Sequence, residues 1–350
     1  MRLLRGPVVL VALLVGCSPT PAPTQTGQFA PALSSSRLSA RTLGLRSTSV
    51  VSRGAGIVRP DRRSSHMKPG ASGQDLLYVA DPGTDDVDVY AFPGGAPAGV
   101  LTGFAEPQGE CSDKSGNVYV TNTRASNIVV FAHGATQPSK TLSDPGEYPV
   151  GCTINPRTQD LAVSNEFDTG FHKGSVSIYK HASGSPHTIS APTFWQAFFL
   201  SYDDDGNIFL DGLSNDSYYR FLFAELAKGS SSFSTIPIDQ SINYPGGVTW
   251  TGNALAIGDQ EYAITQSAIY AVQVSAGSGK VVGTTLLSNT CDIVQFTIKK
   301  PYVVAPDACK AKVGLFAYPA GGTPKKGITS GLQAPIGSAV SLSPARTVSR

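Results

Sequence analysis

Four cysteines have spacings that could support covalent chemistry: Cys111, Cys152, Cys291 and Cys309. With Cys17 near the N-terminus set aside, the number of cysteines is even, which suggests disulfides if the chain is exported, and four cysteines allow three pairings. We expect Cys291 to pair with Cys309, 18 residues away, and Cys111 to pair with Cys152, because the latter two fall at nearly the same place in successive repeats. A zinc site and buried free thiols are the alternatives, although no Cys-x-x-Cys pair or neighbouring histidine supports zinc.

Other residues that could catalyse a reaction are present but poorly arranged. The five histidines fall in the N-terminal segment, near the ends of predicted strands or in an insertion: His66, His133, His172, His181 and His187. The run Asp203-Asp204-Asp205-Gly206 lacks the alternating oxygen ligands of a calcium-binding loop, so we expect a hairpin turn there. No Gly-x-Ser-x-Gly elbow occurs. We therefore assign no catalytic residue, metal site or cofactor.

Aromatic residues are concentrated in one part of the chain. They are Phe194, Trp195, Phe198, Phe199, Tyr218, Tyr219, Phe221 and Phe223. Alternation along a strand would bury about half of them between sheets, so core packing accounts for many. Trp195 opens a predicted strand and is the best single candidate for a ligand contact, because aromatic rings can stack on sugars or flat molecules.

Six copies of a short strand pattern must position these residues. Each copy is a β-branched or aromatic run that ends in a small residue, usually followed by Asp or Asn. The equivalent positions are Tyr78, Tyr119, Ala162, Phe209, Ala256 and Val303, which are separated by 41, 43, 47, 47 and 47 residues. A four-stranded propeller blade needs about 40 to 50 residues. The period predicts an all-β fold, a six-bladed β-propeller.

The two ends of the folded part are predicted to close the ring. The chain enters at the second strand of its first blade near Leu76, and it ends in an inner-strand pattern from Pro335 to Leu342. That last strand would complete the first blade by pairing with its second strand. The six inner strands are expected to begin near Pro107, Pro149, Trp195, Pro245, Cys291 and Pro335.

Two segments carry a family resemblance. Ser115-Gly-Asn-Val-Tyr-Val-Thr-Asn122, followed by Ile128-Val-Val-Phe131, resembles a repeat of the YVTN and NHL-type propellers. Asp205-Gly-Asn-Ile-Phe209 is similar, and the resemblance covers about residues 75–343. It implies a propeller of the lactonase and gluconolactonase superfamily, but it does not imply an activity.

Related lactonases hold a divalent metal with Asn and Asp residues at the openings of inner strands. The matching positions here include Gln108, and none of them carries a carboxylate. Glu106, Glu147 and Asp292 lie close to such openings and could face the axis. Together with Trp195 and Gln108, they are our candidate ligand-contact residues.

The N-terminus has the pattern of an export signal. Arg2 and Arg5 precede the apolar run Val8–Val15, which is too short to span a membrane. Leu14-Val15-Gly16-Cys17 resembles the lipobox of bacterial lipoproteins, which implies cleavage before Cys17 and its lipidation. An ordinary signal peptide with an incidental cysteine is the alternative. Ser18 after the cysteine favours the outer membrane or the cell surface over the inner membrane.

The predicted domain organisation follows from these segments. Residues 1–16 are the signal peptide, 17–72 a disordered tether that begins with the lipidated cysteine, 73–345 the propeller and 346–350 a tail. From residue 18 the tether carries eight basic residues and one acidic residue, whereas residues 73–350 carry 17 basic and 24 acidic residues. An acidic, exported head disfavours nucleic acid as a partner.

We expect a monomeric, non-enzymatic binding module held at the cell envelope by a lipid anchor in the membrane. Its partner would be a protein, a small molecule or a glycan that contacts the axial opening or the blade loops. The alternative is a metal-dependent, lactonase-like hydrolase or a lyase that uses carboxylates near the propeller axis.

Overall fold

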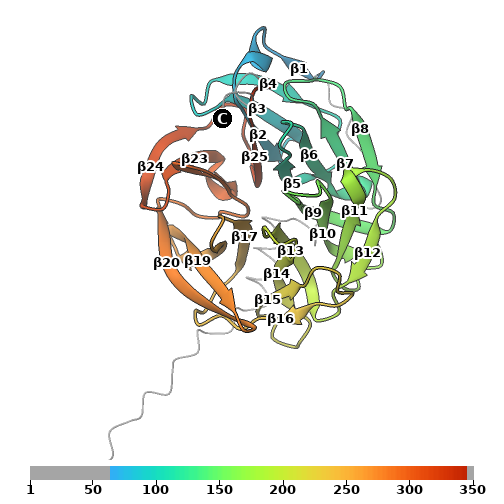
Figure 1. The fold of residues 1–350 in the computed structure, drawn as a ribbon. Helices are drawn as coiled ribbons and strands as arrows, with labels where there is room; N and C mark the ends of the chain where they lie inside the picture. Colours follow the sequence, from blue (N-terminus) through green and yellow to red (C-terminus); the bar gives the residue numbers. More distant parts are fainter. Residues whose placement is uncertain (1–63, 345–350) are drawn as a thin grey trace, which may run out of the picture.

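The computed structural model describes residues 64–344. The predicted signal peptide, Cys17, most of the predicted tether and the tail lie outside these residues. Within them, no helix has the length and apolar character needed to cross a membrane. The described chain folds into antiparallel sheets that stand around a central axis (Figure 1).

The strands repeat in the order inner, second, third and outer. The inner strands are β5 (Pro107–Ser112), β9 (Glu147–Ile154), β13 (Phe194–Tyr202), β17 (Pro245–Trp250), β21 (Thr297–Lys299) and β25 (Gly337–Ser341). The second strands are β2 (Leu76–Asp81), β6 (Val118–Asn122), β10 (Leu161–Asp168), β14 (Ile208–Ser214), β18 (Leu255–Ala263) and β22 (Tyr302–Asp307).

The third and outer strands follow in each repeat. The third strands are β3 (Asp86–Ala91), β7 (Asn127–Phe131), β11 (Ser175–Tyr179), β15 (Phe221–Leu226), β19 (Gln266–Ser275) and β23 (Lys312–Ala317). The outer strands are β4 (Pro97–Leu101), β8 (Lys140–Ser143), β12 (His187–Ser190), β16 (Ser234–Thr235), β20 (Ser278–Ser288) and β24 (Gly321–Ile328). Short 3-10 helices occur at Ala71–Gly73, Thr123–Ala125, Lys180–Ala182 and Ala308–Lys310.

These strands form five sheets, of which one has eight strands. That sheet consists of two antiparallel halves, β17–β20 and β21–β24, joined where Leu287 lies parallel to Gly322. The strands β2 and β6 are buried along their whole length between neighbouring sheets. Burial on both faces explains why they consist of apolar runs rather than alternating polar and apolar residues.

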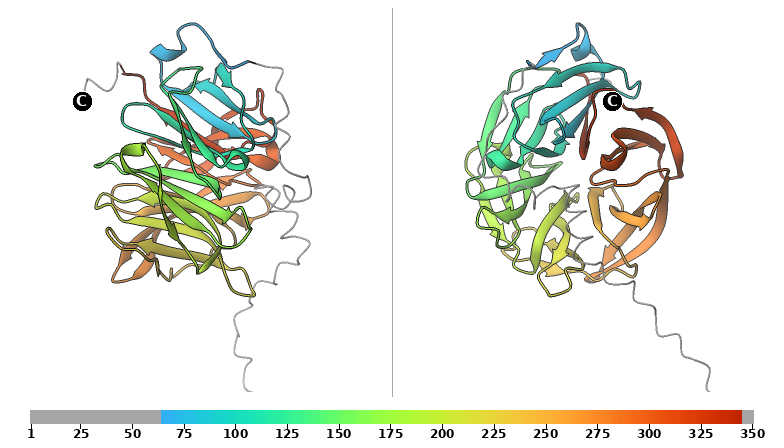
Figure 2. Two further views of the ribbon diagram at one scale, coloured as in Figure 1. Left: turned by 90° about the vertical axis from the view of Figure 1, so that its right-hand side faces the viewer. Right: turned by 180° about the vertical axis from the view of Figure 1, so that it is seen from behind.

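The two ends of the described chain meet in one sheet, as the sequence predicts. β25 pairs antiparallel with β2, from Leu76 opposite Ser341 to Ala80 opposite Gly337. The views from the front and from behind both place these two strands side by side (Figures 1 and 2). A short strand, β1 (His66–Met67), which the sequence analysis placed in the tether, pairs with the outer strand β4 of the same sheet.

Glycines bring the inner strands close together around the axis. Four inner segments contain Pro-x-Gly, in which the glycines are Gly109, Gly151, Gly247 and Gly337. A Cβ atom on Gly337 would overlap the carbonyl oxygen of Gln108, and one on Gly151 would lie 2.7 Å from the carbonyl oxygen of Phe198. Each glycine therefore permits a contact between neighbouring sheets that any side chain would block.

Candidate functional site

The ring has two distinct faces. Since every repeat runs from inner to outer strand, we call the side where the inner strands begin the start face and the opposite side the end face. The connections between second and third strands also lie on the start face. The predicted contact residues Glu106, Gln108, Glu147, Trp195 and Asp292 all belong to segments at the start face.

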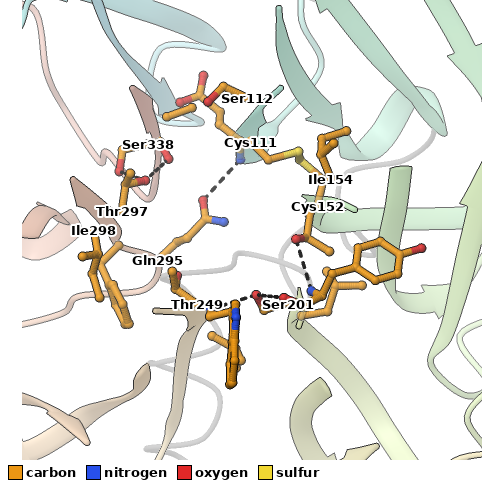
Figure 3. Close-up of a pocket in the computed structure, with 18 of the residues that line it drawn as sticks. Cys111, Ser112, Cys152, Ile154, Ser201, Thr249, Gln295, Thr297, Ile298 and Ser338 are labelled. Carbon is orange, nitrogen blue, oxygen red and sulfur yellow. Dashed lines mark hydrogen bonds between the residues drawn. A yellow bond between two sulfur atoms is a disulfide. The ribbon is translucent and has the colours of Figure 1, made fainter. Parts of the chain in front are cut away.

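A cavity of about 300 Å³ opens at the end face between the ends of the inner strands (Figure 3). Its hydroxyl groups bond to the backbone of neighbouring inner strands. Ser112 Oγ donates to the carbonyl of Val340 at 3.0 Å, and Ser201 Oγ accepts from the N–H of Trp250 at 2.9 Å. These bonds satisfy polar groups on the free edges of the inner strands, so the hydroxyls have a structural role.

Gln295 lies across this cavity. Its Oε1 accepts a hydrogen bond from the backbone N–H of Glu110 at 3.2 Å, while its amide nitrogen is turned into the open space (Figure 3). Burial raises the pKa of the nearby Glu110 carboxyl well above its usual value, although the backbone of Ala80 and Ala339 opposes the shift. Burial thus disfavours the charged form of this carboxyl relative to an exposed glutamate.

Sequence reasoning missed this cavity. Thr153, Ser201 and Thr249 occupy equivalent places on consecutive inner strands and are 48 residues apart. This recurrence of a hydroxyl residue was a signal that could have located the cavity. The repeat pattern alone does not show which edge of a strand faces the axis.

A row of aromatic rings crosses the start face from the β9–β12 sheet to the β13–β16 sheet. The centroid distances are 5.5 Å from Tyr148 to Phe171, 6.0 Å from Phe171 to Phe167, 5.6 Å from Phe167 to Trp195 and 4.4 Å from Trp195 to Tyr219. We call these five residues the aromatic row. Phe167 is buried, whereas Phe171 and Tyr219 are 39% and 40% exposed. The row is therefore anchored in the core and open to solvent at its surface.

Exposed apolar side chains gather on the same face. Six large hydrophobic side chains are exposed within residues 64–344, and five of them lie in the connections between second and third strands or, for Tyr262, at the end of a second strand: Phe171, Tyr218, Tyr219, Tyr262 and Ile264. These connections belong to three consecutive repeats. In the other three repeats the corresponding connections, residues 82–85, 123–126 and 308–311, contain only small and polar residues besides one proline. We call the five exposed residues the apolar patch.

A narrow slot lies beside the row. Glu106, Gln108, Arg124 and Glu166 line it together with three rings of the row, and its volume is about 10 Å³. Arg124 Nε bonds to Glu106 Oε2 at 2.5 Å. Gln196 Nε2 donates to Glu166 Oε1. The slot has room for one group of the size of a hydroxyl.

The structure brings together three of the five predicted contact residues. Trp195 belongs to the aromatic row, and Glu106 and Gln108 line the slot beside it. Glu147 adjoins Tyr148 in sequence and lies near Asp144 and Asp168. Asp292 lies elsewhere on the ring, where its backbone N–H faces Asp307 Oδ1 at 3.4 Å. The sequence did not single out Phe167, Phe171 or Tyr148, because their contacts cross from a loop to two strands.

Both disulfides favoured by the sequence are present. Cys111 is joined to Cys152, and Cys291 to Cys309. Within the described part of the chain, the one close group of three potential metal ligands is Cys291, Asp307 and Cys309. Two of its three donor atoms are thus the sulfurs of a disulfide, which leaves no thiolate to bind a metal.

Two carboxyls below the start face predict how stability depends on pH. Burial raises the pKa of Asp144 to about 6 and that of Glu147 to about 7. The folded state therefore holds protons that the unfolded state has lost. Their contribution to stability is complete below about pH 4 and is lost as the pH rises through about 7. We expect the melting temperature of the full chain to fall by several degrees between pH 4.5 and 7.5, since each unit of pKa shift corresponds to at most about 1.4 kcal/mol.

Thermal denaturation at a series of pH values tests this expectation. The Glu147→Gln and Asp144→Asn variants should each flatten the decline, whereas Asp205→Asn should leave it unchanged because that side chain is 82% exposed. A melting temperature that rises steadily over this pH range would contradict the assignment.

Comparison with known proteins identifies the fold class. The chain folds as a β-propeller. A crystal structure of a nidogen/laminin complex contains a similar chain, with a TM-score of 0.60, 10% identity, and coverage of 77% of this chain and 99% of that one. The PQQ-bound aldose sugar dehydrogenase of Streptomyces coelicolor is also similar, with a TM-score of 0.51, 11% identity, and coverage of 68% and 86%. No protein-family model and no curated protein matches the sequence.

Proposed function

We propose that this protein is an envelope-anchored lipoprotein whose six-bladed propeller, of the YVTN and NHL type, acts as a non-enzymatic binding module. The six blades are the four separate sheets and the two halves of the eight-stranded sheet. The lipid at Cys17 would hold the module at the membrane, and acyl labelling of the Cys17→Ser variant tests that anchor.

The apolar patch is the observation that supports binding. Five of the six exposed large hydrophobic side chains within residues 64–344 lie on one face, in or next to neighbouring connections. Single exposed apolar side chains scattered over a surface are normal in soluble proteins. A group of them on one face is typical of an interaction site. Because the patch lies on the start face, the partner would contact the connections between second and third strands.

The groups at the end-face cavity give the enzyme alternative less support. Burial raises the pKa of Glu110 and so disfavours its charged form, and Asp204 Oδ2 accepts a hydrogen bond from Trp250 Nε1 at 3.0 Å. Ser112 and Ser201 are bonded to backbone groups, and no histidine lines the cavity. A nucleophile paired with a base, which hydrolysis would require, is thus not assembled among the described residues there.

Binding to envelopes tests the proposal. The full chain carrying Cys17→Ser, which cannot be lipidated at this position, would be sedimented with envelopes from cells that lack the protein. We expect saturable binding that weakens at least about tenfold when Phe171, Tyr218, Tyr219, Tyr262 and Ile264 are all replaced by serine. Val282→Ser is the matched control, because Val282 is 51% exposed but lies on outer strand β20. Equal binding by the patch variant would refute the proposal.

A further inference from the structure

The aromatic row is held in an unusual backbone conformation at its two exposed rings. Phe171 has φ 57° and Tyr219 has φ 47°. Bulky side chains rarely adopt this left-handed region, and such residues are concentrated at functional sites. Both residues lie in connections of the start face, and both rings contact the row through buried or half-buried neighbours. The loops thus present aromatic rings at the surface although another backbone conformation would cost less.

Two glutamine side chains beside the row are fixed in orientation. Gln196 Nε2 donates to Glu166, and Gln108 Nε2 lies 3.5 Å from Glu106 Oε1. Turning either amide round would place its oxygen against a carboxylate, so the observed orientation is favoured. Both Oε1 atoms are then left buried without a hydrogen-bond donor among residues 64–344.

These oxygens call for a ligand that donates hydrogen bonds. Gln108 is 2% exposed and lines the slot, which has room for one hydroxyl group. Buried acceptors in folded proteins are almost always satisfied, so an unpaired one beside an opening of this size points to a small donor group from outside. A hydroxyl group both fits the slot and supplies the hydrogen.

Charges around the row are paired with one another. Arg124 pairs with Glu106 at 2.5 Å, His172 with Asp168 at 2.9 Å, and Arg220 with Asp216 at 3.1 Å. These three basic side chains are thus each compensated by a neighbouring carboxylate. A polyanion or a polycation would find little net attraction at these groups, which favours an uncharged ligand.

We propose that the aromatic row binds a neutral polysaccharide. The apolar faces of sugar rings would pack on Phe171, Trp195 and Tyr219, and one sugar hydroxyl would enter the slot and donate to Gln108 Oε1. Pyranose rings suit this site because they combine an apolar C–H face with hydroxyl donors at the rim. This inference rests on the proposed function and specifies the class of its ligand.

Affinity electrophoresis tests the inference directly. The full chain carrying Cys17→Ser would be run in native gels that contain soluble neutral polysaccharides (a β-glucan, a galactomannan, dextran or starch), and it would be sedimented with insoluble cellulose and chitin. Alginate, a carboxylated polysaccharide, serves as the charged comparison. We expect at least one neutral polysaccharide to bind, with an affinity that does not depend on salt.

Variants identify the contacts. Tyr219→Ala and Phe171→Ala, both at exposed positions, should each weaken binding about tenfold, and Trp195→Ala should weaken it further. Gln108→Met keeps the length of the side chain but removes the acceptor, so it should weaken binding about threefold or more at an unchanged melting temperature. The matched control is Val282→Ala, which removes an exposed apolar side chain on outer strand β20, outside the row and the apolar patch, and should leave polysaccharide binding within about twofold.

The possible failures are distinguishable. If no neutral polysaccharide binds, or if binding survives Tyr219→Ala, the inference is wrong. If alginate alone binds and salt abolishes the binding, the ligand is anionic and the inference is equally wrong. If envelope binding withstands periodate oxidation of the envelopes but is lost when they are treated with protease, the partner is a protein and not a glycan. The inference is then wrong, but the proposed function as a binding module stands. If the Cys17→Ser chain itself does not bind envelopes, with or without the further substitutions, the proposed function is wrong.

Discussion

Replacing Gly337 by valine should destabilise the protein by about 3 kcal/mol or more, because overpacking against backbone cannot be relieved by a side-chain movement. A Cβ atom on Gly337 would overlap the carbonyl oxygen of Gln108 and approach the Cβ atom of Ala80 to 3.2 Å. Gln108 belongs to the neighbouring sheet, and Ala80 lies on β2, which pairs with β25. The substitution thus forces apart the contacts that close the ring.

Thermal and urea denaturation of the full chain measure this effect. A melting temperature lower by roughly 10 °C is expected from that loss of free energy for a domain of this size. Gly327→Val is the matched control, since Gly327 lies on outer strand β24 and its added Cβ would have no atom within 4 Å. We expect the control to change stability by less than about 0.5 kcal/mol. Equal effects of the two substitutions would show that the ring tolerates a side chain at position 337.

Removing the disulfide between Cys111 and Cys152 should lower the free energy of unfolding by about 4 kcal/mol, if its main effect is to restrict the unfolded chain. The two cysteines are 41 residues apart, so the crosslink spans a whole repeat. It joins the inner strands β5 and β9 in the wall of the end-face cavity (Figure 3). Without it, the inner strands of these two sheets would be held together only by noncovalent contacts.

Urea denaturation of the Cys111→Ser/Cys152→Ser double variant gives this value. The double variant at Cys291 and Cys309 is the comparison, and it should lose about 3 kcal/mol because those residues are only 18 apart. A reductant should lower the free energy of unfolding of the wild-type chain at least as much as either pair of substitutions does. The same reductant should have a smaller effect on each double variant, which has only one disulfide left. A variant at Cys111 and Cys152 as stable as the oxidised wild-type chain would show that this crosslink does not stabilise the fold.

These tests concern the scaffold on which the proposed site depends. Phe171 and Tyr219 lie in loops, but their rings pack through Phe167 and Trp195 into strands β10 and β13. Loops placed on a rigid scaffold commonly carry binding residues. Loss of the scaffold would abolish binding indirectly, so the contact variants need unchanged melting temperatures to be informative.

Repeated local patterns in the sequence were sufficient to predict the propeller. The spacing of Tyr78, Tyr119 and their counterparts reflects the length of one four-stranded unit, which local strand and turn preferences largely determine. The closure of the ring by the segment after Pro335 followed from the same periodicity, as did the pairing of Cys111 with Cys152, whereas the pairing of Cys291 with Cys309 followed from their short separation. The inner strand expected near Cys291 begins only at Thr297, because Val294 and Gln295 bond to Gly247 and Ile336 of neighbouring sheets instead of β22.

The candidate site depended on contacts that periodicity does not contain. The sequence indicated Trp195, Gln108 and Glu106, since each lies at the opening of an inner strand. Tertiary structure decided that Phe171 and Tyr219 reach Trp195 from two different loops, that Asp292 lies elsewhere on the ring and that Gln108 keeps an unpaired oxygen. The physical reason is that a strand pattern specifies local spacing and burial, whereas packing between neighbouring sheets determines which side chains meet.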